Sequence, residues 1–166
     1  MSAQPNGQNV VNLFVYGTLR PDDDSKAAWT HSFNNPDSYK ALAEFGFIEG
    51  VKMYFSDYPV AVFTSDPNDR IYGYIISKLL IVADEIEEYP SMYDRTAVHA
   101  YPVCKETYDK KVMETNSDEC VLIEKSSQNP ITAYVYHRSL QHIAEVDKNL
   151  NPLAIPQNDW LRRNRQ

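Results

Sequence analysis

Apolar and aromatic residues recur along this chain mostly in short runs or at alternate positions, a pattern typical of β-strands. Tyrosine and phenylalanine, which favour pleated and half-buried surfaces, are concentrated in the same runs. The pattern predicts strands over residues 13–16, 41–48, 51–55, 60–64, 71–77, 95–103, 121–124 and 132–137. Because these strands leave little room for crossover helices, we expect an α+β fold: a small single domain built on a largely antiparallel, mixed β-barrel with a few short helices.

One segment has the spacing of a helix instead. In residues 77–89, SKLLIVADEIEEY, apolar residues recur three or four positions apart and form a single stripe: Leu79, Val82, Ala83 and Ile86. Pro90 follows and is expected to end this helix. Weaker helical patterns cover residues 24–32 and 139–148.

The acidic residues at the end of this helix are not equivalent. At about 100° per residue, a helical wheel places Glu87 beside Ala83 at the edge of the apolar stripe, whereas Glu85 and Glu88 point away from it. An acidic helix end is usually a solvated face, which is the plain interpretation of the cluster. Glu87 alone has a position that suits a buried acid or base.

The chain is long enough for one domain with an ordinary core. We expect a flexible N-terminal segment over residues 1–11, a single domain over 12–160 and a basic C-terminal tail over 161–166. Residues 105–130 are more polar than their surroundings. They predict a long hairpin or an excursion from the core, with residues 120–123 as its inner strand.

Charge and composition narrow the classes of function. Asp and Glu outnumber Lys and Arg by 23 to 16, and the resulting net charge of -7 argues against nucleic-acid binding. No apolar run approaches the roughly 20 residues that span a bilayer, and the first residues lack the features of a signal peptide, which together predict a cytoplasmic protein. Cys104 and Cys120 are expected to be reduced thiols.

Several kinds of site lack their sequence signatures. The four histidines have no metal-ligand spacing, so we expect no metal site. There is no Gly-x-Ser-x-Gly motif, and five glycines are few for a phosphate-binding loop. What remains, besides Glu87, is the glycine of YGTLR. Directly after a strand, Gly17 would let consecutive backbone N–H groups point toward an anion or a polarised carbonyl, although a plain turn glycine is the simpler interpretation.

Five motifs taken together resemble the γ-glutamylcyclotransferase-like family: FVYGTLR at 14–20, DYP at 57–59, GY at 73–74, ADEIEEYPSMYDRTAV at 83–98 and AYVYH at 133–137. Their order and approximate spacing look most like those of the γ-glutamylamine cyclotransferases and the plant avirulence-induced relatives. The resemblance covers about residues 13–137, with a further element in NDW at 158–160. It implies a small mixed α/β domain around a β-barrel, which agrees with the strand pattern.

The resemblance also implies an activity. Such an enzyme cyclises the γ-glutamyl group of a γ-glutamyl amine or amino acid to 5-oxoproline and releases the amine, with no cofactor. Glu87, counted from Asp84 in Asp-x-x-Glu, matches the catalytic acid and base. The residues that it implies in substrate binding are Tyr16, Gly17, Thr18, Leu19, Tyr93, Arg95 and Tyr136. The turn is expected to hold either the substrate carboxylate or the oxyanion that develops on the carbonyl.

We expect a monomer that binds a small γ-glutamyl substrate, with no nucleic-acid or membrane partner. Two alternatives stay open at this point. One is a non-catalytic binding module for a γ-glutamyl or amino-acid-like metabolite, and the other is an interaction domain that uses a tyrosine-rich surface.

Overall fold

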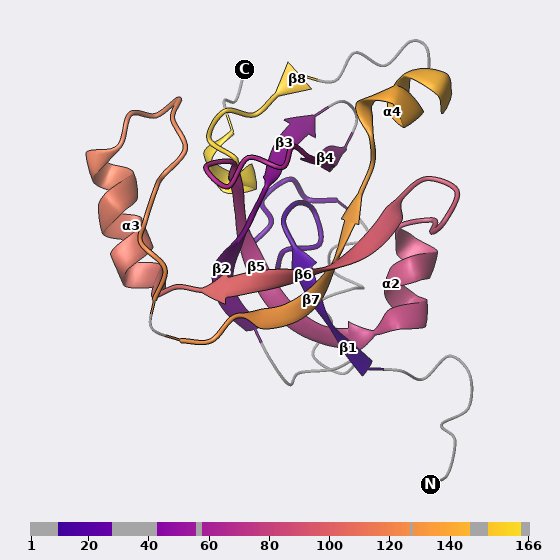
Figure 1. The fold of residues 1–166 in the computed structure, drawn as a ribbon, viewed down its shortest axis with the longest axis horizontal. Helices are drawn as coiled ribbons and strands as arrows, with labels where there is room; N and C mark the ends of the chain where they lie inside the picture. The colour runs from indigo at the N-terminus through magenta and orange to yellow at the C-terminus, as the bar shows by residue number, and fades with distance from the viewer. Residues whose placement is uncertain (1–9, 28–42, 56–57, 127, 147–152, 164–166) are drawn as a thin grey trace, which may run out of the picture.

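The computed structural model describes residues 10–27, 43–55, 58–126, 128–146 and 153–163. Its centre is a closed, mixed barrel of five strands (Figure 1). In barrel order these are β1 (Val10–Val15), β5 (Arg70–Leu79), β2 (Ala43–Glu49), β6 (Asp94–Pro102) and β7 (Ile131–His137). Antiparallel pairs join the successive strands, and a parallel pairing of Leu13 with Tyr134 closes β7 onto β1. The predicted fold class is therefore confirmed.

Three further strands extend the sheet beyond β7. They are β4 (Pro59–Phe63), β3 (Val51–Phe55) and β8 (Leu153–Ala154). β4 runs parallel to β7 through the pairing of Ala61 with His137, and β3 forms an antiparallel hairpin with β4. This extension brings the start of β4 to the end of β1, where the candidate site lies.

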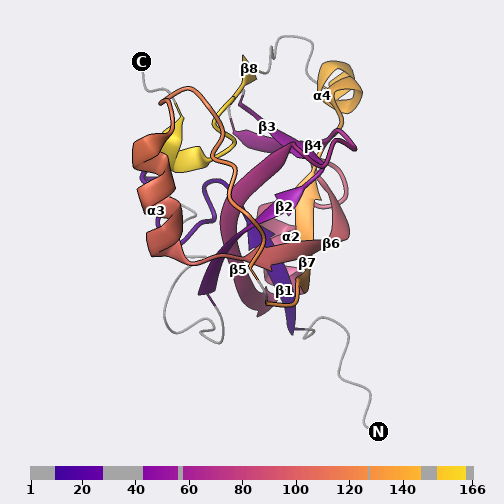
Figure 2. The same ribbon diagram turned by 60° about the vertical axis from the view of Figure 1, so that its left-hand side comes forward.

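The helices are short and lie on the outside of the barrel. They are α2 (Leu80–Ile86), α3 (Lys105–Glu114), α4 (Leu140–Val146) and a 3₁₀ turn, η1 (Trp160–Arg162). In Figures 1 and 2, α3 lies on the opposite side of the barrel from α2. The helix predicted from residue 77 begins at Leu80, because β5 continues its ladder with β1 as far as the pairing of Val10 with Leu79. None of the helices in the described ranges is long and apolar enough to cross a membrane.

Between β6 and β7, the described part of residues 105–130 contains a helix and not the predicted hairpin. The segment begins with helix α3 and returns without a strand, so the strand predicted at 121–124 is wrong. Val121 is buried as the strand pattern required. Its carbonyl, however, accepts a hydrogen bond of 2.6 Å from the Tyr72 hydroxyl, and the carbonyl of Ile123 accepts one of 2.7 Å from Arg70. Side chains rather than a neighbouring strand hold this segment.

The two weaker helical predictions and the prediction of reduced cysteines can also be compared with the structure. The helix predicted at 139–148 corresponds to α4. Of the one predicted at 24–32, residues 24–27 are not helical and the remainder lies outside the described residues. Cys104 and Cys120 are both free thiols.

The core consists of separate clusters on the faces of the strands. Along β1, Leu13 and Val15 pack into one cluster, whereas Phe14 and the following Tyr16 pack into another, as the alternation of a strand requires. The first cluster also contains Ala83 of α2 and Ile143 of α4, so these helices cover that face. A third cluster, which includes Tyr72, lies beneath α3 and contains Tyr108 of that helix.

Candidate active site

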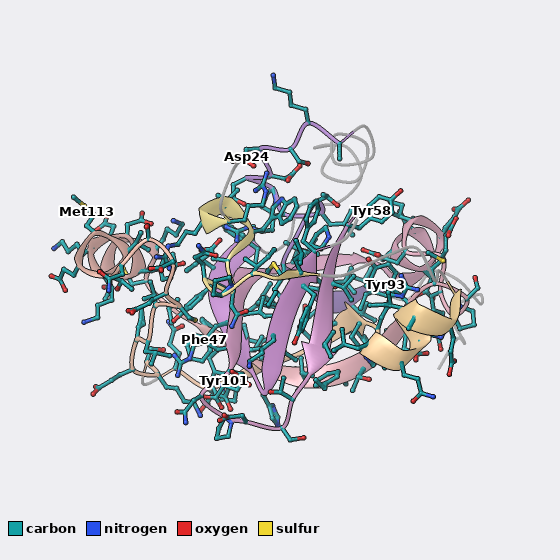
Figure 3. The ribbon with its side chains drawn as sticks, turned by 90° about the horizontal axis from the view of Figure 1, so that it is seen from above. Asp24, Phe47, Tyr58, Tyr93, Tyr101 and Met113 are labelled. Atoms are coloured by element: carbon teal, nitrogen blue, oxygen red, sulfur yellow. The ribbon has the colours of Figure 1, made fainter. Side chains whose placement is uncertain are left out.

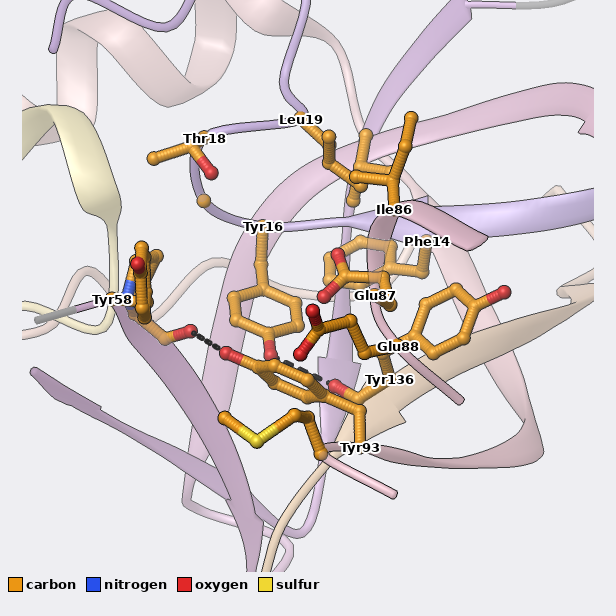
Figure 4. A pocket seen from close by; sticks show the side chains of 14 residues that line it. Phe14, Tyr16, Thr18, Leu19, Tyr58, Ile86, Glu87, Glu88, Tyr93 and Tyr136 are labelled. Carbon is orange, nitrogen blue, oxygen red and sulfur yellow. Dashed lines mark hydrogen bonds between the residues drawn. The ribbon is translucent and has the colours of Figure 1, made fainter. Parts of the chain in front are cut away.

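A cavity of about 360 Å³ opens where β1 ends (Figure 4). Its walls come from the turn after β1, the start of β4, the end of α2 with the loop that follows, and β7. Of the residues that the sequence singled out, those that line it are Tyr16, Gly17, Thr18, Leu19, Glu87, Tyr93 and Tyr136. Segments up to 120 residues apart thus form one concave site. Figure 3 shows Tyr58 and Tyr93, which both line it, on the side of the molecule away from Met113 of α3.

The turn after β1 is a tight reversal that starts at Gly17. The Arg20 amide donates to the Gly17 carbonyl at 3.0 Å, which closes the turn. A side chain at Gly17 is excluded by Pro59, because a Cβ there would lie only 2.2 Å from the proline Cγ. The glycine is therefore required by close packing of the turn against the start of β4, and this contact forms one wall of the cavity.

Glu87 supplies a carboxyl group to the opposite wall. Its amide continues the hydrogen bonding of α2, donating to the Ala83 carbonyl at 2.9 Å. The side chain is partly accessible because it faces the cavity, and Figure 4 shows it pointing toward the ring of Tyr16. Desolvation by the surrounding protein raises the pKa of the Glu87 carboxyl from 4.5 to about 8. Burial alone accounts for this shift of the Glu87 pKa.

Glu88 also lines the cavity, although the helical wheel placed it away from the apolar stripe. The reason is that α2 ends at Ile86 and Glu88 has a left-handed backbone with φ of 50°. The wheel no longer applies once the chain has left the helix. The spacing of apolar residues in the sequence does not indicate that the chain leaves the helix before Glu88.

The tyrosine hydroxyls around the cavity are already occupied by the fold. Tyr16 donates to the Tyr136 carbonyl at 2.8 Å and accepts from the Ala61 amide at 3.0 Å. Tyr93 donates to the Pro59 carbonyl at 3.2 Å. Burial, aided by the nearby charge of Glu87, raises the pKa of both phenols well above the ordinary value. These tyrosines therefore stay neutral and shape the cavity, whereas the Glu87 carboxyl, with its pKa raised to about 8, can exchange a proton near neutral pH.

Asp84 organises the same helix face one turn before Glu87. It accepts from the Tyr136 hydroxyl at 2.7 Å and forms an ion pair with Arg95 at 2.5 Å. Arg95, expected among the substrate-binding residues, does not line the cavity; its guanidinium stacks on the Tyr89 ring at 3.8 Å. Its contacts orient Tyr136 through Asp84, a role that only the three-dimensional arrangement reveals.

Within the described ranges, no three His, Cys, Asp or Glu side chains gather in a way that could hold a metal ion. The cavity residues bring carboxylate and phenol oxygens together with the backbone of a tight turn. Such an arrangement can bind a small zwitterion and accept a proton from it.

The sequence from residue 13 to residue 162 matches the family described as gamma-glutamyl cyclotransferase, AIG2-like. No curated protein matches the chain in sequence. The fold is similar to that of an AIG2-like protein from mouse, with a TM-score of 0.50 at 20% identity over 78% of each chain. It is similar as well to YkqA from Bacillus subtilis, with a TM-score of 0.50 at 17% identity over 92% of this chain and 40% of that one. At these identities the two structures support the fold alone.

Proposed function

The chain belongs to the AIG2-like γ-glutamyl cyclotransferase family, and on that premise we propose that it cyclises a γ-glutamyl amide to 5-oxoproline with release of the amine. The observation that carries the proposal is the Glu87 carboxyl. It faces the Tyr16–Leu19 wall across a cavity of about 360 Å³, and its pKa is raised to about 8.

The size of the pKa shift suits the reaction. An ordinary glutamate titrates at about 4.3 and an α-amino group at about 8, or higher beside the free α-carboxylate of a γ-glutamyl compound, so proton transfer between them in water costs at least roughly 5 kcal/mol. With the pKa of Glu87 at about 8, the same transfer is close to balanced. The Glu87 carboxylate therefore has a proton affinity high enough to take a proton from the substrate ammonium, and the carboxyl can then give that proton to the departing amine.

The proposed reaction needs no other reagent. Glu87 removes one proton from the substrate ammonium, and the freed amine attacks the γ-carbonyl carbon within the same molecule. The new C–N bond closes the lactam ring while the amide C–N bond breaks. The ammonium loses two protons in all and the departing amine gains two, so a single carboxyl that relays them one after the other balances the reaction. The turn at Gly17 would steady the oxygen that carries negative charge.

The direct test is Glu87→Gln, measured by release of 5-oxoproline from γ-glutamyl-ε-lysine, several γ-glutamyl amino acids and glutathione. Glutamine keeps the shape but cannot accept a proton, so we expect kcat/KM to fall by about 10²–10⁴-fold while the melting temperature is retained. Glu85→Gln is the matched control, because Glu85 is exposed on the same helix. Substantial turnover by a folded Glu87→Gln protein would contradict the proposed role.

The same assay separates the alternatives. If no γ-glutamyl compound is turned over but one of them raises the melting temperature, the protein is a binding module for such metabolites. If none is turned over and none binds, the interaction domain is favoured. Turnover by the wild-type protein excludes both.

A further inference from the structure

Arg138 is a buried cation close to the cavity that the proposed reaction leaves unused. It follows β7 directly, and its amide donates to the Ala61 carbonyl at 3.1 Å. The side chain is only 4% exposed. Its Nε and Nη2 atoms are buried and have no hydrogen-bond partner, and no carboxylate among the described residues forms an ion pair with it.

Burial of the Arg138 guanidinium with two unsatisfied nitrogens lowers the stability of the folded protein. Removing a guanidinium from water is unfavourable unless a counter-charge or hydrogen bonds compensate for the lost hydration. The adjacent aromatic contact compensates only in part, since the Arg138 guanidinium lies 5.7 Å from the centre of the Tyr93 ring. A buried cation beside the cavity, with two guanidinium nitrogens that have no hydrogen-bond partner, places a positive field at one end of the binding site.

The position of Arg138 defines the end of the cavity that it affects. Tyr93, which lines the cavity, lies against Arg138 and donates to the Pro59 carbonyl, and Pro59 in turn packs against Gly17. The charge of Arg138 lowers the pKa of the Tyr16 and Tyr93 phenols, while the charge of Glu87 raises it. Both tyrosines are therefore within reach of a positive group and a negative group that come from different elements.

We propose that Arg138 is a positioning residue that draws the α-carboxylate of the substrate to the Tyr93 and Pro59 end of the cavity. This inference rests on the proposed function. A γ-glutamyl group carries an ammonium and a carboxylate on one carbon, and Arg138 orients that pair so that the ammonium faces Glu87. Arg138 does not line the cavity, so its field acts through Tyr93, which lines the cavity and whose ring centre lies 5.7 Å from the guanidinium.

The test uses two substrates that differ only in the carboxylate. γ-Glutamyl-n-butylamide closes to 5-oxoproline, and 4-aminobutyryl-n-butylamide closes to 2-pyrrolidinone by the same chemistry without an α-carboxylate. For Arg138→Met we expect kcat/KM for the γ-glutamyl substrate to fall about tenfold, mostly through KM, and kcat/KM for the 4-aminobutyryl substrate to change less than about twofold. Arg138→Lys, which keeps the charge, should recover part of the loss.

Stability supplies an independent measurement. Because two buried guanidinium nitrogens have no hydrogen-bond partner and no carboxylate in the described ranges pairs with Arg138, Arg138→Met should melt at or above the temperature of the wild-type protein. Arg162→Met is the matched control: Arg162 lies in η1 and donates to the carbonyls of Asn116 and Glu119, away from the cavity. This control should leave kcat/KM unchanged for both substrates.

Each other outcome has a definite meaning. An equal loss with both substrates would overturn the inference, because Arg138 would then act on the general chemistry rather than on the carboxylate. No loss with the γ-glutamyl substrate, or a lower melting temperature in both Arg138→Met and Arg138→Gln, would overturn it as well. If the wild-type protein releases no 5-oxoproline from any γ-glutamyl amide, the proposed function fails instead.

Discussion

At the scale of single residues, the proposed chemistry depends on how far the protein raises the pKa of one carboxyl group, that of Glu87. Burial of Glu87 stabilises its neutral form, so the carboxyl becomes an effective base only as the pH approaches about 8. The same glutamate in water would be ionised above about pH 5. The environment of Glu87, rather than its identity alone, determines the pH at which it can act.

The raised pKa of Glu87 predicts a pH dependence of kcat/KM. Below the pKa, the fraction of ionised Glu87 falls tenfold per pH unit, so we expect log kcat/KM to rise with a slope of about 1 up to pH 7 and to level off near about 8. The measurement is 5-oxoproline release at low substrate concentration across this range. Glu85→Gln should show the same profile as the wild-type protein. A rate independent of pH between about 5.5 and 8 would show that the base has an ordinary pKa.

At the scale of elements, the cavity depends on how closely the turn after β1 approaches β4. The sequence predicts the end of a strand and a special glycine at this place, and both are present. It does not predict that the constraint comes from Pro59, 42 positions further on, because that contact exists only after β4 has paired with β7. The two elements are therefore linked by shape complementarity rather than by a local turn preference.

Gly17→Ala tests this link. Its Cβ would lie 2.2 Å from Pro59 Cγ, so the turn or β4 must shift, and we expect a loss of stability of about 1–3 kcal/mol together with a lower kcat/KM. Urea unfolding and the 5-oxoproline assay measure the two effects. Pro59→Ala removes the clashing Cγ, so the double variant should be less impaired than the sum of the single variants. Simple additivity would show that the contact does not constrain the turn.

The predicted elements were most reliable where the pattern was local. Alternation along β1 and the three- to four-residue stripe of α2 follow directly from the geometry of a strand and a helix. Helix α3 was missed because only Tyr108 of its residues is buried, so it has little apolar periodicity. The strand expected at 121–124 was wrong because the burial of Val121 reflects packing beneath α3 and not a ladder.

At the scale of the whole molecule, the cavity wall is connected to the C-terminal segment through a buried ionic network. Arg20, which closes the Gly17 turn, is 1% exposed and pairs with Asp22 and Asp159, each at 2.8 Å. Asp159 also accepts a hydrogen bond from Tyr108 of α3. Figures 1 and 2 show α3 and the C-terminal segment on the same side of the barrel. The network therefore joins the turn, the excursion and the last segment of the domain.

Asp159→Asn is predicted to weaken this connection. Loss of one partner leaves the buried Arg20 guanidinium with Asp22 alone, so we expect a cost of about 3 kcal/mol, or a melting temperature lower by roughly 6–12 °C. Asp118→Asn is the control, because Asp118 is exposed. Thermal unfolding of both variants measures the difference. An unchanged melting temperature for Asp159→Asn would mean that Asp22 alone compensates the buried arginine.

The sequence by itself determined the properties that depend on neighbours along the chain. These are strands β1 to β7, the main helix, the break at Gly17 and the placement of Glu87 at the edge of an apolar stripe; the family follows from the order of its motifs. Only the tertiary structure decided that Glu87 and the turn face one cavity, that Arg95 contacts Tyr136 through Asp84, and that Arg138 is buried with two guanidinium nitrogens that have no hydrogen-bond partner. The physical reason is the distance along the chain over which each effect acts. Strand and helix periodicity extends over a few residues, whereas the pairing of buried charges joins groups as far apart in the sequence as Arg20 and Asp159.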